Sequence, residues 1–351
     1  MEPHSIELPR NILIGNGVLE RVANVCRELR ISGKPLILTG DNTKKVAGER
    51  IMKLFLDSEP DTCMEIVRGA SKKEVERLNG RIPMDLSLVV SVGGGKVIDV
   101  GKLLAYQAKL PFVSVPTAPS HDGIASERVS LKDGGVFHSL KARAPIAIIA
   151  DIQILMNAPY KLIASGGADI ISNCTAVYDW KLARKKGEYY SEYAAALSLL
   201  SSEIVLNCAD IIKQREERGI RNLVEALISS SISMSLVESS RPASGSEHMF
   251  SHALDQLKSE TGINSSLHGE QCGVGSILFA YLQGQDWERL RNGLEALGAP
   301  TTARQLGIEK EMIVEAMLRA KNVRERYTIL NEKPLDRDRA SEICRLTGVT
   351  D

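Results

Sequence analysis

Three of the six histidines lie close together in the second half of the chain, at positions 248, 252 and 268. His248 and His252 are four residues apart, so both project from one face of a helix. Imidazole nitrogens are common zinc ligands. The spacing therefore predicts a metal site with His248 and His252 as a pair and His268 as the third ligand, although the Glu that follows the first His in zinc proteases is absent. The alternative is that these histidines are solvated or cap helices.

An acidic ligand for such a site is best supplied by Asp169, in the stretch SGGADIISNCTAVYDW. Carboxylate oxygens complete many zinc sites that contain two histidines. Two glycines precede Asp169 and an apolar run follows, so we expect it at the start of a helix. The alternative role is that of a helix-start residue favoured by the helix dipole.

A second candidate site is the stretch Leu88 to Lys102, LVVSVGGGKVIDVGK. A β-branched run meets Gly93 to Gly95, and helical spacing follows, which predicts a strand turning into a helix. We expect these glycines to adopt positive φ and to expose bare backbone and helix N–H groups to a phosphate. Val97 and Leu103 stand where a P-loop needs Ser or Thr, and Ile98 stands where a dinucleotide fingerprint needs Gly. The alternative is a plain tight turn.

The loop Pro116 to Ser126, PTAPSHDGIAS, is rich in short polar side chains and follows another expected strand. Ligands of open parallel sheets bind beyond the carboxyl ends of the strands, so the glycine turn and this loop are expected to face one cavity. Ser120, His121 and Asp122 are also common turn residues, and a purely structural loop is the alternative.

The elements that must position these residues differ between the two halves. Apolar runs at 35–43, 62–67, 86–92, 110–115 and 144–150 alternate with helical segments, which predicts a parallel sheet with crossover helices. Asp133-Gly134 within 128–140 predicts a hairpin.

Beyond residue 158 the chain is predicted to be helical. The ranges 191–209 and 222–237 lack internal Pro and Gly and are rich in Ala, Leu, Ile and Ser. The Ser-rich range 229–240 is expected to be helix because Ile and Met recur in it. A chain of 351 residues exceeds the size of one hydrophobic core, so we expect an α/β domain over 1–155 and an all-α domain over 156–351.

Composition excludes several classes of protein. Lys plus Arg and Asp plus Glu number 44 each, which disfavours binding to nucleic acid or to anionic membranes. No apolar run approaches a membrane span and the N-terminus lacks an apolar signal region, so we expect a cytoplasmic protein. The six cysteines are scattered and are expected to be reduced.

Five stretches in order, GGGKVIDVGK, PTAPSHDGIAS, GGADIISNCTAVYDW, SEHMFSHALD and LHGEQCGVG, resemble the archaeal sn-glycerol-1-phosphate dehydrogenases. That family belongs to a larger group with glycerol dehydrogenase, iron-type alcohol dehydrogenases and dehydroquinate synthase. The resemblance spans roughly residues 1–280. It implies a Rossmann-like parallel-sheet domain followed by a helical, dehydroquinate synthase-like domain.

The resemblance also implies roles for individual residues. Asp169, His248 and His268 would bind one zinc ion, which removes His252 from the ligand set that the spacing predicted. Asp122, Asp169 and His252 would touch the substrate, with Asp122 and His252 as catalytic residues. NAD or NADP would bind to a further set of residues, namely Gly94, Gly95, Lys96, Val97, Ile98, Asp99, Thr117, Ala118, Pro119, Ser120 and Ser126.

The implied reaction is zinc-assisted reduction of dihydroxyacetone phosphate to sn-glycerol 1-phosphate, which supplies archaeal-type ether phospholipids. His252 would deliver the proton, because imidazole titrates near neutral pH. A homo-oligomer is implied as well. Iron-type relatives carry a His where this chain has Asn173, which favours the glycerol-type branch. The alternatives are a glycerol or other polyol dehydrogenase, a dehydroquinate-synthase-like lyase, and a nucleotide-binding sensor without turnover. Asp41 would favour NAD if it bonds a ribose hydroxyl, but it is equally a turn residue.

Overall fold

The computed structural model describes residues 6–133, 136–262 and 266–350. The chain divides into two compact units, Met1–Pro159 and Tyr160–Asp351, whereas the sequence analysis placed the division after residue 155. Within the described ranges, none of the helices combines the length and the apolar character that crossing a bilayer requires.

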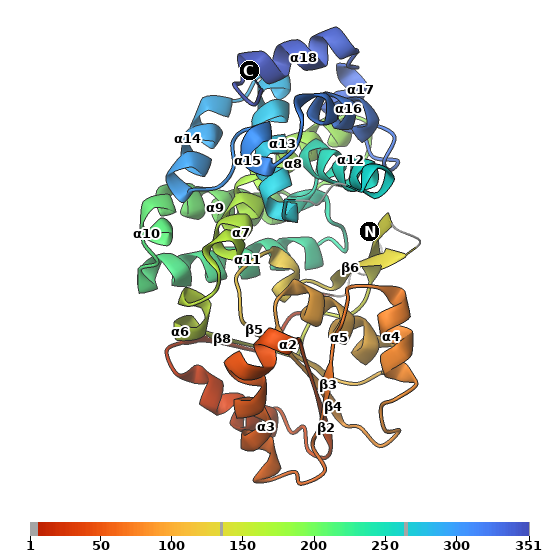
Figure 1. Cartoon of the computed structure of the whole chain (residues 1–351), viewed down its shortest axis with the longest axis vertical. Coiled ribbons are helices and arrows are strands. Elements are labelled where there is room, and N and C mark those ends of the chain that lie inside the picture. The colour runs from red at the N-terminus through yellow and green to blue at the C-terminus, as the bar shows by residue number, and fades with distance from the viewer. Residues whose placement is uncertain (1–5, 134–135, 263–265, 351) are drawn as a thin grey trace. The chain divides into compact units, whose positions relative to one another are not determined.

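The first unit contains a six-stranded sheet in the order β1-β8-β5-β4-β2-β3, in which every neighbouring pair is parallel (Figure 1). Its strands are β1 (Asn11–Gly15), β2 (Pro35–Thr39), β3 (Cys63–Ile66), β4 (Leu88–Gly93), β5 (Phe112–Pro116) and β8 (Ala147–Asp151). The predicted parallel sheet is therefore confirmed. Strand β1 was not predicted from the sequence, because its pairing with a distant strand decides its structure. It pairs with β8 at the edge of the sheet.

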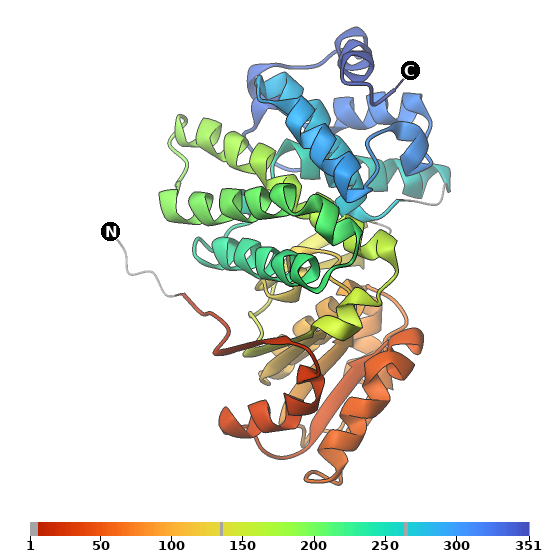
Figure 2. The same ribbon diagram turned by 90° about the vertical axis from the view of Figure 1, so that its left-hand side faces the viewer.

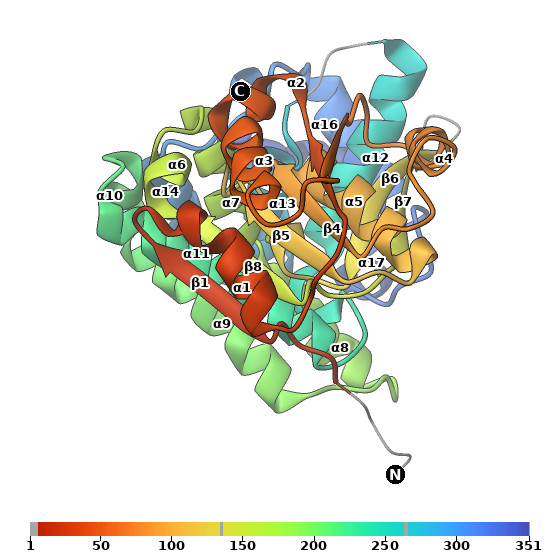
Figure 3. The same ribbon diagram turned by 90° about the horizontal axis from the view of Figure 1, so that it is seen from below.

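Helices connect the strands of the first unit. They are η1 (Val18–Arg21), α1 (Val22–Glu28), α2 (Asp41–Thr43), η2 (Lys44–Gly48), α3 (Glu49–Leu56), α4 (Lys72–Asn79), α5 (Gly95–Ala108), η3 (Asp122–Ile124) and α6 (Ile152–Met156). Val90 and Val92 of β4 pack in one apolar cluster with side chains of α1 and α3. Ser91 points the other way, and its Oγ donates to the carbonyl of Val97 on α5 at 3.1 Å. Helices therefore cover both faces, as Figure 3 shows from below, which explains why β4 is buried throughout.

The predicted hairpin is confirmed. Strands β6 (Arg128–Asp133) and β7 (Val136–Lys141) pair antiparallel, with Arg128 opposite Lys141 and Asp133 opposite Val136. Gly134, the second residue of the predicted turn, lies outside the described residues.

Among the described residues of the second unit, the regular elements are all helices, as predicted, and they run from green to blue in Figure 2. They are α7 (Tyr160–Ile171), α8 (Asn173–Arg184), α9 (Glu192–Asn207), α10 (Ala209–Lys213), α11 (Glu217–Ser235), η4 (Arg241–Ala243), α12 (Ser246–Thr261), α13 (His268–Gln283), α14 (Trp287–Leu297), α15 (Ala303–Leu306), α16 (Lys310–Ala320), α17 (Ile329–Glu332) and α18 (Arg337–Leu346). The long helices predicted at 191–209 and 222–237 correspond to α9 and α11.

Two details of the helical prediction were wrong. The range 229–240 is helical only to Ser235, because the chain leaves α11 and Glu238 adopts a left-handed φ of 48°. Asp169 lies in the last turn of α7 and not at a helix start. Gly167, two residues before it, is a packing residue, since a Cβ there would lie 2.6 Å from Cδ2 of Leu297 on α14.

Helix α13 packs closely against α7 and α12 because glycines line its contacts. A Cβ on Gly269 would lie 2.0 Å from the carbonyl oxygen of Ser165 on α7. A Cβ on Gly275 would lie 3.1 Å from the carbonyl oxygen of Glu247 on α12. Bare backbone at these positions thus sets how near the three helices approach.

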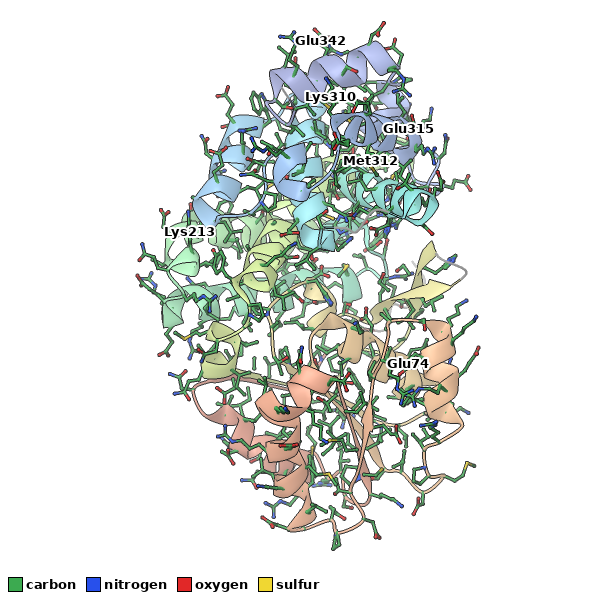
Figure 4. The ribbon with its side chains drawn as sticks, viewed as in Figure 1. Glu74, Lys213, Lys310, Met312, Glu315 and Glu342 are labelled. Carbon is green, nitrogen blue, oxygen red and sulfur yellow. The ribbon has the colours of Figure 1, made fainter. Side chains whose placement is uncertain are left out.

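The last helices of the unit are tied together by charge. Glu315 of α16, labelled in Figure 4, accepts from Arg319 Nε and from Arg337 Nη2 of α18, each at 2.8 Å. Arg319 also donates to Glu260 of α12 at 2.8 Å. These ion pairs are partly exposed, so each adds little to the free energy of unfolding. Their main effect is to orient α16 and α18.

Gly269→Ala is expected to push α13 away from α7, because the added methyl meets backbone that cannot rotate aside. We expect about 1–3 kcal/mol of lost stability, the usual cost of overpacking, together with weaker divalent-metal binding. Thermal unfolding and a zinc titration measure the two effects. Gly80→Ala is the matched control, because its Cβ would have nothing nearer than 3.7 Å. Equal melting temperatures for the two variants would contradict this account.

Candidate metal and cofactor sites

Three helices of the second unit bring the predicted metal ligands together. Asp169 comes from the end of α7, His248 from the first turn of α12 and His268 from the first residue of α13. One ligand atom of each, with Sγ of Cys272, forms a group in which all atoms lie within 4.8 Å of one another. Oδ1 of Asp169 is 3.7 Å from Nε2 of His248 and 3.9 Å from Nε2 of His268.

These spacings suit a divalent cation between the donors. A tetrahedral ion with bonds of about 2.0–2.1 Å separates its oxygen and nitrogen ligands by roughly 3.4 Å. Asp169 is 4% exposed, whereas the side chain of His268 is 40% exposed, so the donor group is closed on one side and open on the other. One carboxylate and two imidazoles with an accessible side is the donor set of a catalytic zinc site.

Glu247 fixes the ring of His248. Its Oε1 lies 2.9 Å from Nδ1 of His248, and a carboxylate can only accept, so Nδ1 carries the proton and Nε2 offers its lone pair toward Asp169. Thr175 Oγ1 donates to Oε2 at 2.8 Å, and the Gly245 N–H donates to Oε1 at 2.5 Å. Burial acts to raise the pKa of Glu247, but the bonds and charge of these partners, with His248 foremost, hold it below its ordinary value.

The hydroxyl of Ser251 fixes the ring orientation of His268. Ser251 donates to Oε1 of Gln271 at 2.7 Å, so its oxygen accepts from Nδ1 of His268 at 3.0 Å. The amide of Gln271 is itself oriented, because its Nε2 donates to the Ser266 carbonyl at 3.0 Å and to Asp255 at 3.3 Å. Nε2 of His268 is therefore the lone-pair nitrogen that faces Asp169. Such outer hydrogen bonds set ligand orientation and metal affinity.

His252 lies one turn after His248 on α12, with its ring centroid 5.9 Å from that of His268. It is outside the donor group, contrary to the expectation from spacing alone. Burial, and after it the positive charges of Arg324 and Arg326, lower the pKa of His252 to about 3. The premise that this imidazole titrates near neutral pH was therefore wrong, because burial and nearby guanidinium groups disfavour its charged form.

Sequence reasoning missed three side chains near this group, namely Cys272, Arg324 and Arg326. The one available signal was the four-residue spacing from His268 to Cys272, which places both on one face of α13. The two arginines follow α16 in a stretch with no recognisable motif.

In the first unit the glycine turn lies where the strand order reverses. From β2 the chain continues to β3 on one side, and from its neighbour β4 it continues to β5 on the other. Ligands of open α/β sheets bind beyond the carboxyl ends of the strands at such a point. The turn after β4 begins α5 there, with Gly94 as the residue before the helix.

The glycines of this turn do not adopt positive φ, so that expectation was wrong. Gly94 has φ −81° and ψ −174°, which is ordinary extended backbone. A Cβ on Gly93 would lie 2.7 Å from Val97, and one on Gly95 would lie 1.7 Å from Nε2 of His121. A Cβ on Gly94 would have no atom within 4 Å. Gly93 and Gly95 are thus packing positions, and Gly94 leaves backbone open to a ligand.

The loop after β5 lies beside this turn, as predicted. Gly93 pairs with Pro116, and the Thr117 N–H donates to the Gly93 carbonyl at 3.0 Å. Within the loop, the Gly123 N–H donates to Nδ1 of His121 at 2.7 Å, which holds the imidazole near Gly95. Nδ1 accepts this bond and so carries no proton, and burial lowers the pKa of His121.

Asp99 and Lys102 of α5 anchor the same loop and the hairpin. Lys102 donates to the carbonyls of Gly123 at 2.7 Å and Arg128 at 3.0 Å, and Oδ2 of Asp99 accepts from the Ser130 N–H at 3.1 Å. Burial raises the pKa of Asp99 to about 6 and lowers that of Lys102 to about 8, while each charge partly offsets the other's shift. A buried carboxylate in this position supports the loop and is poorly suited to contact a pyrophosphate.

The remaining expected cofactor residues fall into two groups. Lys96 is exposed, Ser120 is half-buried, and Asp122, the expected substrate residue, is also half-buried. The others are buried and would contribute backbone or shape, namely Val97, Ile98, Thr117, Ala118, Pro119 and Ser126.

Comparisons with known proteins point to one enzyme class. The family described as iron-containing alcohol dehydrogenase matches residues 13–159. A glycerol-1-phosphate dehydrogenase (NAD(P)+) of Methanococcoides burtonii is 49% identical, covering 98% of this chain and 96% of its own. The enzyme of the same name from Pyrococcus furiosus is 48% identical, covering 99% of both chains.

Solved structures share the fold at low identity. A glycerol dehydrogenase from Schizosaccharomyces pombe has a TM-score of 0.80 at 18% identity, covering 99% of this chain and 91% of the other. A sulfoacetaldehyde reductase from Bifidobacterium kashiwanohense in complex with NAD+ has a TM-score of 0.76 at 16% identity, covering 100% of both.

Glu247→Gln is expected to weaken zinc binding by about tenfold or more, because an amide no longer holds Nδ1 of His248 with a negative charge. A competition titration against a chromophoric chelator measures the dissociation constant. Glu288→Gln, at an exposed position of α14, is the matched control and should bind zinc as the unaltered protein does. Identical zinc affinities for both variants would show that Glu247 serves only the packing of α12.

Proposed function

We propose that this chain, which belongs to the glycerol-1-phosphate dehydrogenase family, reduces dihydroxyacetone phosphate to sn-glycerol 1-phosphate with NADH or NADPH. The observation that carries the proposal is the 49% identity over nearly the whole chain to a protein of that name. The product would serve as the backbone of archaeal-type ether phospholipids. From the family resemblance we also propose that the enzyme works in the cytoplasm as a homo-oligomer.

The donor group of the second unit supports a metal-assisted reaction. Asp169, His248 and His268 would hold one zinc ion, with Nε2 of each imidazole fixed as a lone-pair donor by Glu247 and Ser251. When bound, zinc would polarise the ketone and the nicotinamide would supply the hydride. Asp169 is almost fully buried, so its negative charge would attract the cation strongly.

The turn of the first unit supports the cofactor assignment. Gly94 leaves open space where other residues have a Cβ, and the first N–H groups of α5 follow it at the reversal of the strand order. We propose that Gly94, Gly95 and Lys96 hold the pyrophosphate, with Ser120 nearby in the adjoining loop. Val97 and Ile98 would shape the turn, since both are buried.

His252 is proposed to relay the proton as a neutral imidazole. With a pKa of about 3 it does not store a proton at neutral pH. A neutral ring can instead accept a proton from water on one nitrogen while it releases another to the product oxygen from the other nitrogen. Arg324 and Arg326, whose charges lower this pKa, also provide positive charge near His252, which suits a phosphorylated substrate.

The decisive experiment is a reductase assay with dihydroxyacetone phosphate and each nicotinamide cofactor, followed by chiral analysis of the product. We expect stoichiometric oxidation of the cofactor and formation of the 1-phosphate enantiomer. Turnover with glycerol but not with glycerol 1-phosphate in the reverse direction would indicate a polyol dehydrogenase. The absence of net cofactor oxidation, or formation of the 3-phosphate, would refute the proposed function.

His252→Gln is expected to lower kcat by about 100-fold, the lower range for loss of a general acid or base, without loss of bound metal. Because the pKa of about 3 lies below the assay range, wild-type kcat should show no ionisation of this residue between pH 5 and 8. Steady-state kinetics over that range, with metal content measured for each sample, checks both points. His138→Gln, at an exposed position of β7, is the control. Near-normal turnover of His252→Gln would remove the relay.

A further inference from the structure

We propose that Cys272 is a fourth protein ligand of the metal ion in the substrate-free enzyme, joining Asp169, His248 and His268. This inference rests on the proposed metal centre and extends it. The cysteine would make the centre a mixed oxygen, nitrogen and sulfur site.

The first support is the position of the sulfur. Cys272 follows His268 by four residues on α13, so both side chains leave the same face of the helix. Sγ lies 3.6 Å from Nε2 of His268, the nitrogen that carries the lone pair toward Asp169. It also lies within 4.8 Å of the ligand atoms of Asp169 and His248. The sulfur is therefore a member of the donor group and not a neighbour beyond it.

The second support is the length of that contact. Zinc binds imidazole nitrogen at about 2.0–2.1 Å and thiolate sulfur at about 2.3 Å, so a tetrahedral ion separates the two by roughly 3.5 Å. The observed 3.6 Å matches this value. The two contacts of Asp169, at 3.7 and 3.9 Å, need to shorten by only a few tenths of an ångström to meet the same ion.

The third support is the way the helices hold the sulfur. Cys272 is fully buried, and α13 is pressed against α7 and α12 at Gly269 and Gly275 on either side of it. A fully buried sulfur approaches the donor group from its closed side. The side chain of His268 is 40% exposed, so a further ligand can approach the donor atoms from the side of this residue. Four protein donors plus one incoming ligand give the five-coordinate arrangement that zinc accepts during catalysis.

Binding through sulfur has two chemical consequences. The thiol proton leaves to solvent when the metal–sulfur bond forms, so one further proton is released for each metal bound. A thiolate is a soft ligand, and it favours zinc, cobalt and cadmium over magnesium and manganese. Cys272 would thus set which divalent ion the enzyme retains.

The test examines the metal–sulfur bond itself and not turnover. Zinc K-edge absorption fine structure of the substrate-free holoenzyme should show one sulfur at about 2.3 Å beside nitrogen and oxygen at about 2.0–2.1 Å. Titration of the metal-free protein with Co2+ should produce a sulfur-to-cobalt charge-transfer band that saturates at one equivalent. A zinc holoenzyme with only nitrogen and oxygen neighbours would overturn the proposal.

Matched variants test whether the metal-bound sulfur belongs to Cys272. Cys272→Ser and Cys272→Ala should lose the charge-transfer band and bind zinc about tenfold or more weakly, whereas Cys63→Ser, altered on strand β3 of the first unit, should keep both properties. His248→Ala tests whether the band belongs to this centre, and it should lose the band as well. A band that persists in Cys272→Ala would overturn the proposal even if the other variants behave as expected.

The outcome is separable from that of the proposed function. Wild-type protein that reduces dihydroxyacetone phosphate but shows no sulfur ligand would refute the role of Cys272 and leave the enzyme assignment intact. A sulfur ligand in protein that does not reduce this substrate would refute the enzyme assignment alone. Protein that binds no Co2+ or zinc would refute the ligand role of Cys272 together with the metal centre.

Discussion

The close contact of α13 with α7 and α12 is the constraint on which the metal site depends. Asp169, His248 and His268 come from three helices, and the donor atoms must converge to within a few ångströms of one another. A helix pair with ordinary side chains at the contact keeps its axes about 8–10 Å apart. The bare backbone of Gly269 and Gly275 removes side chains from the contact, so each ligand-bearing turn of α13 lies directly against its partner.

Buried carboxylates in this part of the second unit carry an electrostatic cost that a cation would offset. Asp169, Glu247 and Asp179 are all buried within this part of the second unit. Asp179 accepts from the N–H groups of Ser246 and Ile329, yet burial and the negative charge of Glu247 still raise its pKa to about 7. Buried carboxylates without a compensating charge are expensive. A divalent ion beside Asp169 would supply that charge, which is a physical reason to regard the donor group as built for a metal.

The sequence predicted the fold well where patterns are long and locally coded. Alternating apolar runs predicted the parallel sheet, and Ala- and Leu-rich stretches predicted α9 and α11. The short edge strand β1 was missed because pairing with β8, a contact with distant residues, decides its structure. The placement of Asp169 failed for a related reason. Two glycines before an acidic residue resemble a helix start, but the close approach of Leu297 to Gly167 shows that tertiary packing explains the second of them.

The site was predictable to the extent that residue type determines chemistry. The carboxylate and imidazole side chains indicated a metal site. Residue spacing could not show that His252 lies outside the group of donor atoms or that Cys272 belongs to it. The low pKa of His252 could not be predicted from the sequence. It depends on burial and on Arg324 and Arg326, which are more than 70 residues away along the chain.

Glycine illustrates why motifs alone mislead in this chain. The three consecutive glycines at positions 93, 94 and 95 have different structural roles. The outer two exclude a Cβ because Val97 and the ring of His121 occupy that space, and Gly94 alone faces open space at the start of α5. In the second unit the glycines of α13 serve packing, and through packing they position ligands. A glycine-rich stretch therefore indicates only that another group, either part of the protein or a ligand, comes close to the backbone there. Whether that neighbour is a side chain, another helix or a bound phosphate is decided by residues distant in sequence, which is why the three-dimensional contacts carry the functional argument.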